Sequence, residues 1–319
     1  MRRLIECVPN FSEGRDATRI ATLVRAVESV TGARVLDCHS DPDHNRSVVT
    51  FAGEPEAVEE AALAAVGKAA ELIDLNQHRG EHPRIGATDV LPFVPLAGAT
   101  MAECAAVARR VGGEIWKRYE IPVYFYENAA TQPGRARLEN VRRGQFEGLR
   151  ENVLNDADRA PDVGSARLHP TAGAVAVGAR KLLIAYNITL STTDVAIAEE
   201  IARTIRESSG GLTAVKAIGV TLRSRRLVQV SMNLTDFEVT PIQQVFDAVR
   251  REAERHICMI EGSEIVGLVP RAALDVTADY FFQLDSFSRE QILEERLASV
   301  FGESALGDTP ATRAARSAT

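Results

Sequence analysis

The sequence predicts an α/β (α+β) fold made of two ferredoxin-like βαββαβ subdomains in tandem. Short apolar runs typical of strands alternate along the chain with longer segments whose apolar residues recur at helical spacing. The second half of the chain then repeats the order of strands and helices of the first half, which indicates an internal duplication. The chain has 319 residues, which is enough for two domains of ordinary size.

Each element of the first half follows from its own pattern. Strands are predicted where the apolar runs are short, at residues 4–8, 35–38, 48–52, 90–95 and 123–126. Helices are predicted where apolar residues share one helical face, at residues 20–30, 54–75 and 101–111. Gly32 is a stop signal behind the first of these helices. The first half therefore contains the order βαββαβ.

The second half shows the same order. Strands are predicted at residues 182–188, 215–222, 227–234 and 265–268. The third of these strands alternates between apolar and polar residues, as a strand with one buried face does. The first helix has an N-cap signal at residues 191–194 and carries isoleucines along one face. The second helix covers residues 242–249. Two more helices are predicted near the end of the chain, at residues 271–282 and 289–300.

A long segment between the two halves, residues 128–178, is rich in Gly, Pro, Arg and Asp and has few apolar periods. We therefore expect a connector, and connectors of this length in compact proteins are usually functional or disordered. The expected organisation is an N-terminal subdomain at residues 1–178, a C-terminal subdomain at residues 179–301 and a flexible tail at residues 302–319.

Composition and charge exclude several classes of protein. Acidic residues outnumber basic residues by 44 to 37, which gives a net charge of −7. No long Lys/Arg block occurs, so nucleic-acid binding is not expected. The most apolar stretch, residues 57–73, contains four charged side chains, so we expect no membrane span: Glu59, Glu60, Lys68 and Glu71.

The start of the chain and its cysteines indicate the compartment. No apolar segment follows the charged N-terminal residues, so no signal peptide is predicted. The four cysteines form no CxxC pair and are expected to be small core residues in a reducing environment. We therefore expect a cytoplasmic protein.

The densest polar cluster, residues 37–46, lies in the predicted loop between two strands. It contains two histidines, three aspartates and one arginine, namely Asp37, His39, Asp41, Asp43, His44 and Arg46. Such side chains are metal ligands, but the Asp-Pro-Asp sequence also favours a hydrophilic turn. Because no second ligand set closes a metal site, contact with a substrate is the preferred interpretation.

His82 lies in a second polar cluster, residues 78–89. His78 and His82 have the spacing of a helical zinc pair, but Gly80 and Pro83 argue against a helix, so His82 should project from a loop. In an extended segment, Arg84 lies on the same side as His82. Its guanidinium would keep the imidazole neutral, or it would bind a substrate carboxylate. Residue types alone favour a surface histidine that packs.

A third cluster places Arg180 and Lys181 after Gly178 and before the strand at residues 182–188. A glycine before a cationic pair suits an anion, and it also suits a plain surface turn. The chain contains no P-loop, no GxGxxG and no GxSxG motif. Nucleotide-dependent and α/β-hydrolase chemistry therefore lack their usual signatures.

Five separated stretches resemble the formiminotransferase family, the glutamate formimidoyltransferases of histidine breakdown. In chain order they are ECVPNFSEG at residues 6–14, RGEHPRIGATDV at 79–90, GARK at 178–181, NLTDFEVT at 233–240 and VGLVP at 266–270. Chance agreement over five motifs is negligible. The resemblance implies a folate-dependent transferase with two αβ subdomains and a groove between them.

The family's activity implies transfer of a formimino group from N-formimino-L-glutamate to N5 of tetrahydrofolate, which is a co-substrate. The catalytic histidine of the family falls on His82, which overturns the packing interpretation. Because the chain ends before any cyclodeaminase domain, it resembles the monofunctional form, and a homodimer is expected. The folate-binding segment of the family falls inside the long connector, on Val163, Gly164, Ser165, Ala166, Arg167, Leu168, His169, Pro170, Thr171 and Ala172.

The sequence departs from the animal members of the family at His39. Those members carry an aspartate there, which is proposed to assist proton transfer. In this chain Asp37, Asp41 or His39 itself would have to take that role. The motifs also leave the donor open between formimino-glutamate and formyl-glutamate.

The expected mechanism begins with attack of N5 on the amidine carbon and ends with loss of glutamate from a tetrahedral adduct. His82 would take the proton from N5 and return it to the departing nitrogen. Both substrates carry carboxylates, and the expected anchors are Arg46, Arg84, Arg180 and Lys181. This mechanism requires no metal.

Two functions from other classes compete with this one. The first is a non-catalytic folate-binding or anion-binding protein on the same scaffold, since fold does not decide function. The histidine motif argues against it, because a binding protein needs no acid/base group. The second is RNA recognition by the sheet, which would need exposed aromatic side chains and a basic surface. The sequence has neither signature.

Overall fold

The fold was analysed in a computed structural model that describes residues 3–275, 278, 280–285 and 287–302. The chain divides into two compact units, Met1–Arg180 and Lys181–Thr319. Each unit has its own β-sheet and its own hydrophobic core. The mixed α/β class predicted from the sequence is therefore confirmed. Because β7 ends at Ala179, the first unit continues past residue 178, where the sequence placed a boundary.

The first unit contains a ferredoxin-like βαββαβ core. Its first strand is broken into β1 and β2, which both lie between β4 and β5. With β3 paired to β4, the strand order β3-β4-β1/β2-β5 is that of the split βαβ motif. The elements are β1 (Ile5–Cys7), β2 (Asn10–Phe11), α1 (Ala17–Glu28), β3 (Arg34–Asp41), β4 (Arg46–Gly53), α2 (Pro55–Leu72) and β5 (Thr88–Pro95).

Three further elements extend this sheet beyond β5. They are α3 (Met101–Tyr119), β6 (Val123–Glu127) and β7 (Val175–Ala179). Strand β7 lies between β5 and β6 and runs parallel to both. Since β1 is antiparallel to both β4 and β5, the strands β4, β5, β6 and β7 all begin at one end of the sheet. The loops that precede β4 and β5 therefore come together at that end.

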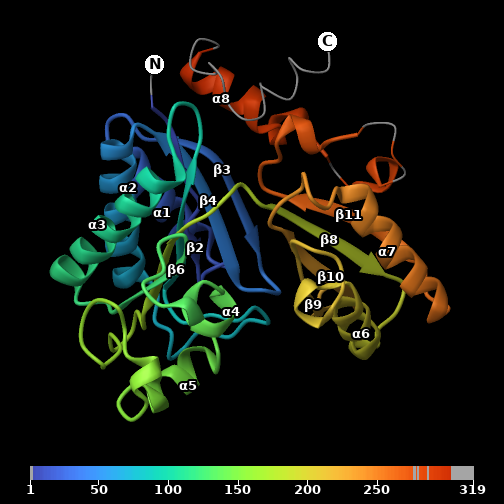
Figure 1. Ribbon diagram of the computed structural model, residues 1–319, viewed down its shortest axis with the longest axis horizontal. Coiled ribbons are helices and arrows are strands. Elements are labelled where there is room, and N and C mark those ends of the chain that lie inside the picture. The colour runs from blue at the N-terminus through green and yellow to red at the C-terminus, as the bar shows by residue number, and fades with distance from the viewer. Residues whose placement is uncertain (1–2, 276–277, 279, 286, 303–319) are drawn as a thin grey trace. The chain divides into compact units, whose positions relative to one another are not determined.

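Helices α1, α2 and α3 cover one face of the first sheet (Figure 1). Helix α3 begins with a capping box between Thr100 and Glu103, which satisfies two backbone N–H groups at its N-terminus. The core between helices and sheet contains the fully buried side chains of Phe11, Phe51 and Phe93. The apolar periods predicted from the sequence thus mark the face of each element that packs into this core.

The segment over residues 128–178, which was expected to be a connector that is functional or disordered, has secondary structure of its own. The segment forms η1 (Pro133–Arg135), α4 (Leu138–Val141), α5 (Gln145–Asn152), η2 (Ala157–Arg159) and strand β7. Phe146 and Leu149 of α5 are buried in the core of the first unit. The helices are too short to show a helical period in the sequence, and Phe146 is the first apolar residue after a charged run, so the pattern gave no signal.

The second unit is a four-stranded antiparallel sheet in the order β11-β8-β10-β9, which is again the split βαβ order. In β10 the apolar residues Val228, Val230, Met232 and Leu234 point into the core, as the alternation predicted. The elements are β8 (Ile184–Leu190), α6 (Val195–Ile205), η3 (Glu207–Ser209), β9 (Val215–Leu222), β10 (Leu227–Leu234), α7 (Ile242–Arg255) and β11 (Ile260–Val266).

The region after β11 is less helical than the sequence suggested. The helix expected at residues 271–282 is not continuous, because Leu274 and Asp275 are not helical. The described elements are η4 (Arg271–Ala273), η5 (Phe281–Gln283), η6 (Arg289–Gln291) and α8 (Leu293–Phe301). Residues 303–319 of the predicted tail lie outside the described residues.

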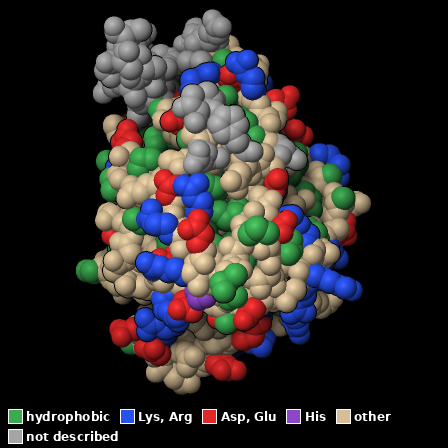
Figure 2. Space-filling view, turned by 90° about the vertical axis from the view of Figure 1, so that its right-hand side faces the viewer, with side chains coloured by type: hydrophobic (Ala, Val, Ile, Leu, Met, Phe, Trp, Pro, Cys, Tyr) green, Lys and Arg blue, Asp and Glu red, His purple; other side chains and the backbone are tan. Residues whose placement is uncertain are grey.

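The surface charges, the helices and the cysteines of the described residues can be compared with what the composition predicted. On the face that Figure 2 shows, Lys and Arg side chains are interspersed with Asp and Glu side chains. Among the described residues, every helix is too short or too polar to traverse a lipid bilayer. Cys7, Cys104 and Cys258 are buried, as expected, but Cys38 on the edge strand β3 is exposed.

A buried ion pair anchors the segment between β6 and β7, and its removal should destabilise the first unit. Arg135 Nη1 lies 2.6 Å from Asp162 Oδ2, and both side chains are less than a tenth exposed. Asp162 also accepts a hydrogen bond from the backbone of Phe125 at 2.8 Å. We expect Asp162→Ala to lower the free energy of unfolding by about 3–5 kcal/mol, because it leaves a buried guanidinium without its partner.

Chemical denaturation measures this loss. Glu151→Ala is the matched control, since Glu151 is an exposed acidic residue on α5. The control should stay within about 0.5 kcal/mol of the wild type. A loss of similar size in both variants would contradict an anchoring role for the pair.

Candidate active site

A cluster of polar side chains lies at the end of the first sheet where β4 and β5 begin. Arg46 is the first residue of β4, and Asp89 is the second residue of β5. His44 precedes β4, and His82 lies in the loop before β5. Arg142 reaches the cluster from the end of α4. The parallel course of β4 and β5 thus brings together two loops that are distant in the sequence.

Asp89 is fully buried and pairs with two guanidinium groups. Its Oδ2 lies 2.8 Å from Arg46 Nη1 and 2.5 Å from Arg142 Nη2, and its Oδ1 accepts the backbone N–H of Ile85 at 2.9 Å. Burial by itself would raise the pKa of Asp89, but the charges of Arg142 and Arg46 and these hydrogen bonds outweigh it and lower the pKa to about 2. Asp89 is therefore ionised, and the trio carries one net positive charge.

Arg46 makes its remaining contacts with a neutral partner. Its Nε and Nη2 donate to Asn10 Oδ1 at 3.0 and 2.7 Å. Burial lowers the pKa of Arg46 to about 10, which still leaves the group charged at neutral pH. The excess positive charge is thus fixed in the protein and attracts an anion to this end of the sheet.

His82 is partly buried in the loop just before Pro83. Its Nδ1 lies 2.8 Å from the carbonyl oxygen of Pro83. A carbonyl oxygen only accepts, so Nδ1 must carry the hydrogen and donate it. In the neutral ring, Nε2 then holds a free lone pair that can accept a proton.

Burial is the main cause that lowers the pKa of His82 well below its usual range, and the charges of Arg46 and Arg142 lower it further. Asp89 and the bond to Pro83 act in the opposite direction. The sequence predicted a neutral imidazole, and that direction is confirmed. The cause it named was wrong, because the arginines that act on His82 are Arg46 and Arg142 rather than Arg84.

Arg84 holds the loops of the site in place. Its Nη1 and Nη2 donate to the two carboxylate oxygens of Glu147 at 2.8 and 2.7 Å, and its Nε donates to His78 Nδ1 at 3.1 Å. His78 Nε2 in turn donates to the carbonyl of Asn45 at 2.9 Å. Burial and the charge of Arg84 lower the pKa of His78, which keeps this ring neutral.

The loop before β4 is locked against the loop that carries His82. Asn45 has a left-handed backbone with φ of 48°. Its Oδ1 accepts the N–H of Gly14 at 3.0 Å, and its Nδ2 donates to the carbonyl of Arg79 at 2.9 Å. At Gly80 a side chain would be impossible without rearrangement, because a Cβ would lie 2.2 Å from the carbonyl oxygen of His44. The two loops therefore approach each other through backbone atoms.

The acidic and histidine side chains of β3 lie along the edge strand, and of these Asp41 is the nearest to the start of β4. His39 lies opposite Val48 in the register of β3 and β4, and Asp41 lies opposite Arg46. Asp41 Oδ1 accepts the backbone N–H of His44 at 2.7 Å and so shapes the loop. Asp37 lies further along β3, opposite Thr50. Within the described residues, no group of three or more potential ligands is arranged to hold a metal ion.

The segment Val163–Ala172 runs toward the same end of the first sheet. Val163 pairs with Val123 at the start of β6, and Gly164 has φ of 104° where a Cβ would meet the ring of Trp116 at 2.7 Å. At its other end, Ala172 accepts the backbone N–H of Ala87 at 2.9 Å. This end of the segment therefore contacts the stretch of chain that follows His82.

Arg180 lies away from His82, and Lys181 belongs to the other unit. Arg180 follows the C-terminal end of β7, and its backbone N–H donates to the carbonyl of Phe93 at 3.1 Å, so it lies at the opposite end of the sheet. Lys181 belongs to the second unit, where it pairs with Asp236 at 2.6 Å. The structure thus brings Arg46 near His82, engages Arg84 with Glu147 and His78, and places Arg180 at the other end of the sheet.

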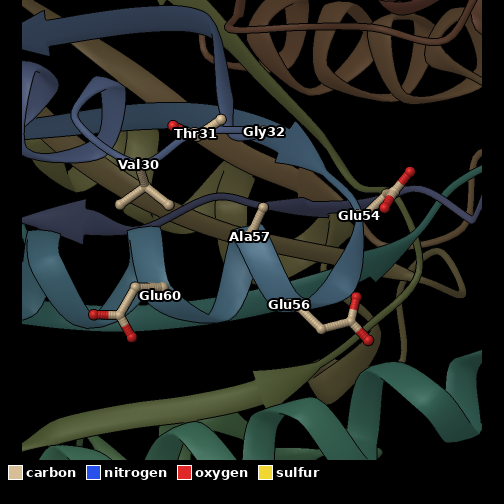
Figure 3. A pocket seen from close by; sticks show the side chains of 7 residues that line it. All are labelled: Val30, Thr31, Gly32, Glu54, Glu56, Ala57 and Glu60. Carbon is tan, nitrogen blue, oxygen red and sulfur yellow. The ribbon is translucent and has the colours of Figure 1, made fainter.

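A cavity of about 380 Å³ lies at that opposite end of the sheet (Figure 3). It is lined by the turn after α1 and the start of α2, at Val30, Thr31, Gly32, Glu54, Glu56, Ala57 and Glu60. The carboxylates of Glu54, Glu56 and Glu60 point apart in Figure 3, so they do not converge on one ligand. The cavity is not part of the cluster around His82.

Sequence reasoning missed several members of the site. Asp89 and Asn10 lie inside motifs that were singled out, so their participation could have been expected. Arg142 lies in the supposed connector and shows no local signal. His44 was considered as a metal ligand, a turn residue or a substrate contact, but not as a neighbour of His82, because its approach to His82 depends on the pairing of β4 with β2 and of β2 with β5.

Glu6 gives the first unit a pH-dependent stability. Burial raises the pKa of Glu6 to about 7 from an ordinary value of 4.5, and the charge of Arg180 only partly opposes this. Below pH 4.5 the carboxyl is protonated in both folded and unfolded chains. As the pH rises toward 7, the unfolded chain ionises first, so the stability falls by up to about 3 kcal/mol.

We expect Glu6→Gln to remove this fall, because glutamine resembles the protonated acid at every pH. The variant should match the wild type near pH 4 and exceed its free energy of unfolding by up to about 3 kcal/mol above pH 7. Glu28→Gln, an exposed residue of α1, is the control and should show no such trend. A difference between Glu6→Gln and wild type that does not change with pH would contradict the raised pKa.

Comparison with known proteins identifies the family. A model of the N-terminal subdomain of the formiminotransferase domain matches residues 4–180, and a model of the formiminotransferase domain matches residues 185–301. The chain is 45% identical over 298 residues to a glutamate formimidoyltransferase of Streptococcus pyogenes serotype M1, covering 93% of this chain and 99% of that protein.

Relatives from other lineages agree. A glutamate formimidoyltransferase of Thermoplasma acidophilum is 45% identical over 296 residues, which cover 92% of this chain and 97% of that protein. A formimidoyltransferase-cyclodeaminase of Mus musculus is 43% identical over 309 residues, which cover 93% of this chain and 57% of the mouse protein. The chain therefore belongs to the formiminotransferase family.

Proposed function

We propose that this protein is a glutamate formimidoyltransferase that moves the formimino group of N-formimino-L-glutamate to N5 of tetrahydrofolate. The names of relatives with 45% identity over almost their whole length support this assignment. The observation that carries it is the state of His82, whose Nδ1–H is bound to Pro83 and whose Nε2 is therefore free to accept a proton. A group of this kind is what the transfer needs, since one proton must leave N5 and one must reach the departing amine.

The reaction moves one proton from N5 to the departing glutamate nitrogen, and His82 carries it. A bond forms between N5 and the amidine carbon, and N5 gives its proton to Nε2 of His82. The tetrahedral adduct then breaks the bond between that carbon and the nitrogen of glutamate, and His82 returns the proton to this nitrogen. The low pKa keeps the imidazole in its neutral form, at the cost of a weaker base, and makes the imidazolium a strong acid for the second step.

The net positive charge beside His82 supports binding of the donor's carboxylates. Two guanidinium groups share one carboxylate in the trio of Arg46, Arg142 and Asp89. Arg142 is the better anchor of the two arginines, because its buried Nε has no hydrogen-bond partner among the described residues. Both arginines donate to Asp89, and Arg46 alone of the two also donates to Asn10. Arg84 is engaged with Glu147 and His78, so we assign it a positioning role.

Tetrahydrofolate is the co-substrate in this proposal, and the segment Val163–Ala172 is its expected contact. The segment's place at the end of the sheet that carries His82 supports this role. The proposed scheme uses no metal. A homodimer and a cytoplasmic location stay predictions from the sequence. A non-catalytic folate-binding protein is the alternative that an activity assay decides.

Replacement of His82 by glutamine should abolish most of the turnover. The variant keeps polarity and approximate size but removes the group that carries the proton. We expect kcat to fall by about 10²–10⁴-fold while the KM values of both substrates change little. The assay uses purified protein with tetrahydrofolate and either formimino-glutamate or formyl-glutamate, followed by absorbance of the folate product.

The assay separates the alternatives. The control variant His256→Gln, on a histidine at the end of α7 in the second unit, should retain full activity. Absence of turnover by the wild type with both donors would contradict the proposed function. Wild-type kcat in His82→Gln would contradict only the assignment of His82. Turnover with formyl-glutamate alone would change the donor and leave the transferase class intact.

Replacement of Arg142 by glutamine should weaken binding of the donor. A charged hydrogen bond contributes about 1.5–3 kcal/mol, so KM for the donor should rise about 10–100-fold with a smaller change in kcat. Arg143→Gln is the matched control, because Arg143 is an exposed neighbour. If KM for the donor is equal in Arg142→Gln and Arg143→Gln, Arg142 is not an anchor.

Tetrahydrofolate should protect the segment Val163–Ala172 from proteolysis. The segment offers a trypsin site at Arg167, which is well suited to this test. We expect cleavage after Arg167 to slow when a saturating folate is added, while cleavage at the exposed Arg225 in the β9–β10 turn keeps its rate. Equal slowing or no slowing at both sites would count against the assigned contact.

A further inference from the structure

His44 has a buried nitrogen that the fold leaves unsatisfied. The residue is only 8% exposed, and its Nε2 is buried with no hydrogen-bond partner among the described residues. A buried polar atom without a partner costs about 1–3 kcal/mol. Such an atom calls for an explanation, and a catalytic role is one of the established ones.

The ring of His44 lies directly against the ring of His82. The two centroids are 5.9 Å apart, and the ring planes are inclined by 49°. Both rings belong to loops that the site holds rigidly. The backbone N–H of His44 donates to Asp41 at 2.7 Å, and its carbonyl packs against Gly80 of the other loop. The proximity of the two imidazoles is thus built into the fold.

The charges around His82 create a need for a second proton acceptor. When His82 takes a proton it becomes an imidazolium beside Arg46 and Arg142, whose charges disfavour it. Asp89 cannot compensate fully, because it is already shared by both arginines. The imidazole of His44, whose centroid lies 5.9 Å from that of His82, offers a ring nitrogen that can accept a hydrogen bond from the new N–H and share its proton.

We propose that His44 is a positioning and proton-relay residue that acts through His82 during group transfer. This inference rests on the proposed function. The proton that leaves N5 is held between the imidazoles of His82 and His44 until the bond from carbon to the glutamate nitrogen breaks. It then passes to that nitrogen, so both rings return to their starting state and no other bond changes. The unsatisfied Nε2 of His44 is the acceptor that the fold keeps ready.

The test uses two substitutions in the full chain. His44→Gln retains a hydrogen-bonding amide that cannot relay a proton, and His44→Phe retains a flat ring without nitrogen. We expect kcat to fall about 10–100-fold in both variants, with little change in either KM, because the relay acts in the transition state. His256→Gln is the control and should behave as the wild type.

A double substitution separates a relay from mere packing. If His44 acts through His82, then His44→Gln should cause no further loss of kcat in a His82→Gln background, since the two residues form one unit. Equal losses in both backgrounds would overturn the inference. Wild-type kcat in His44→Gln would also overturn it, and so would a fall in activity explained by a raised KM.

The pKa of His82, measured by NMR, is a readout that does not depend on activity. It tests the inference even if a variant turns over poorly or the wild type is inactive. A relay partner stabilises the protonated form of His82, so removal of His44 should lower the pKa of His82 measured by NMR. We expect a downward shift of at least about half a unit in His44→Phe. An unchanged or raised pKa of His82 would contradict the inference. An inactive wild type would contradict the proposed function separately.

Discussion

The burial of one carboxylate, Asp89, is the constraint on which the rest of the site depends. An ionised carboxylate is stable in the interior only when charges and hydrogen bonds surround it. Asp89 therefore binds the start of β4 through Arg46 and the end of α4 through Arg142. It also accepts the backbone N–H of Ile85, which fixes the loop after Pro83. Three segments distant in the sequence are joined at a single side chain, and Asn10 of β2 joins them through Arg46.

The same constraint determines the chemistry. Two guanidinium groups on one carboxylate leave a positive charge that both disfavours an imidazolium and attracts an anion. The first effect adds to burial, which is the main cause, in keeping His82 neutral. The second effect would favour the carboxylates of the proposed donor. The same two arginines therefore contribute both to the neutral state of His82 and to the positive charge of the site.

Local patterns in the sequence were sufficient for the βαββαβ order of both units, but not for the segment between β6 and β7 or for the role of His82. The split βαβ order was predicted because strand and helix periods are local properties, and the alternation in β10 gave its buried face correctly. The choice of His82 as the catalytic residue came from motif resemblance and stays a prediction. The contacts of Arg84 were not predictable in the same way. Alternation along an extended segment placed Arg84 beside His82, whereas α5 supplies Glu147 and draws the guanidinium away.

Residues that reach the site only through tertiary structure could not be predicted from the sequence. Arg142 sits in a segment without apolar period, and nothing local shows that α4 returns to the start of β5. His44 meets His82 only because β4 and β5 run parallel on either side of the first strand. These residues are close in space through sheet register, which a single sequence does not display.

The central claim is that burial beside a net-positive trio holds His82 neutral and that the carbonyl of Pro83 keeps its proton on Nδ1. Nitrogen-15 NMR of the labelled imidazole tests it most directly. We expect the spectrum at pH 7 to show a protonated Nδ1 and a bare Nε2, and the ring to titrate well below the ordinary histidine pKa of about 6.5. A titration midpoint at or above 6.5, or a proton on Nε2 in the neutral ring, would contradict the account.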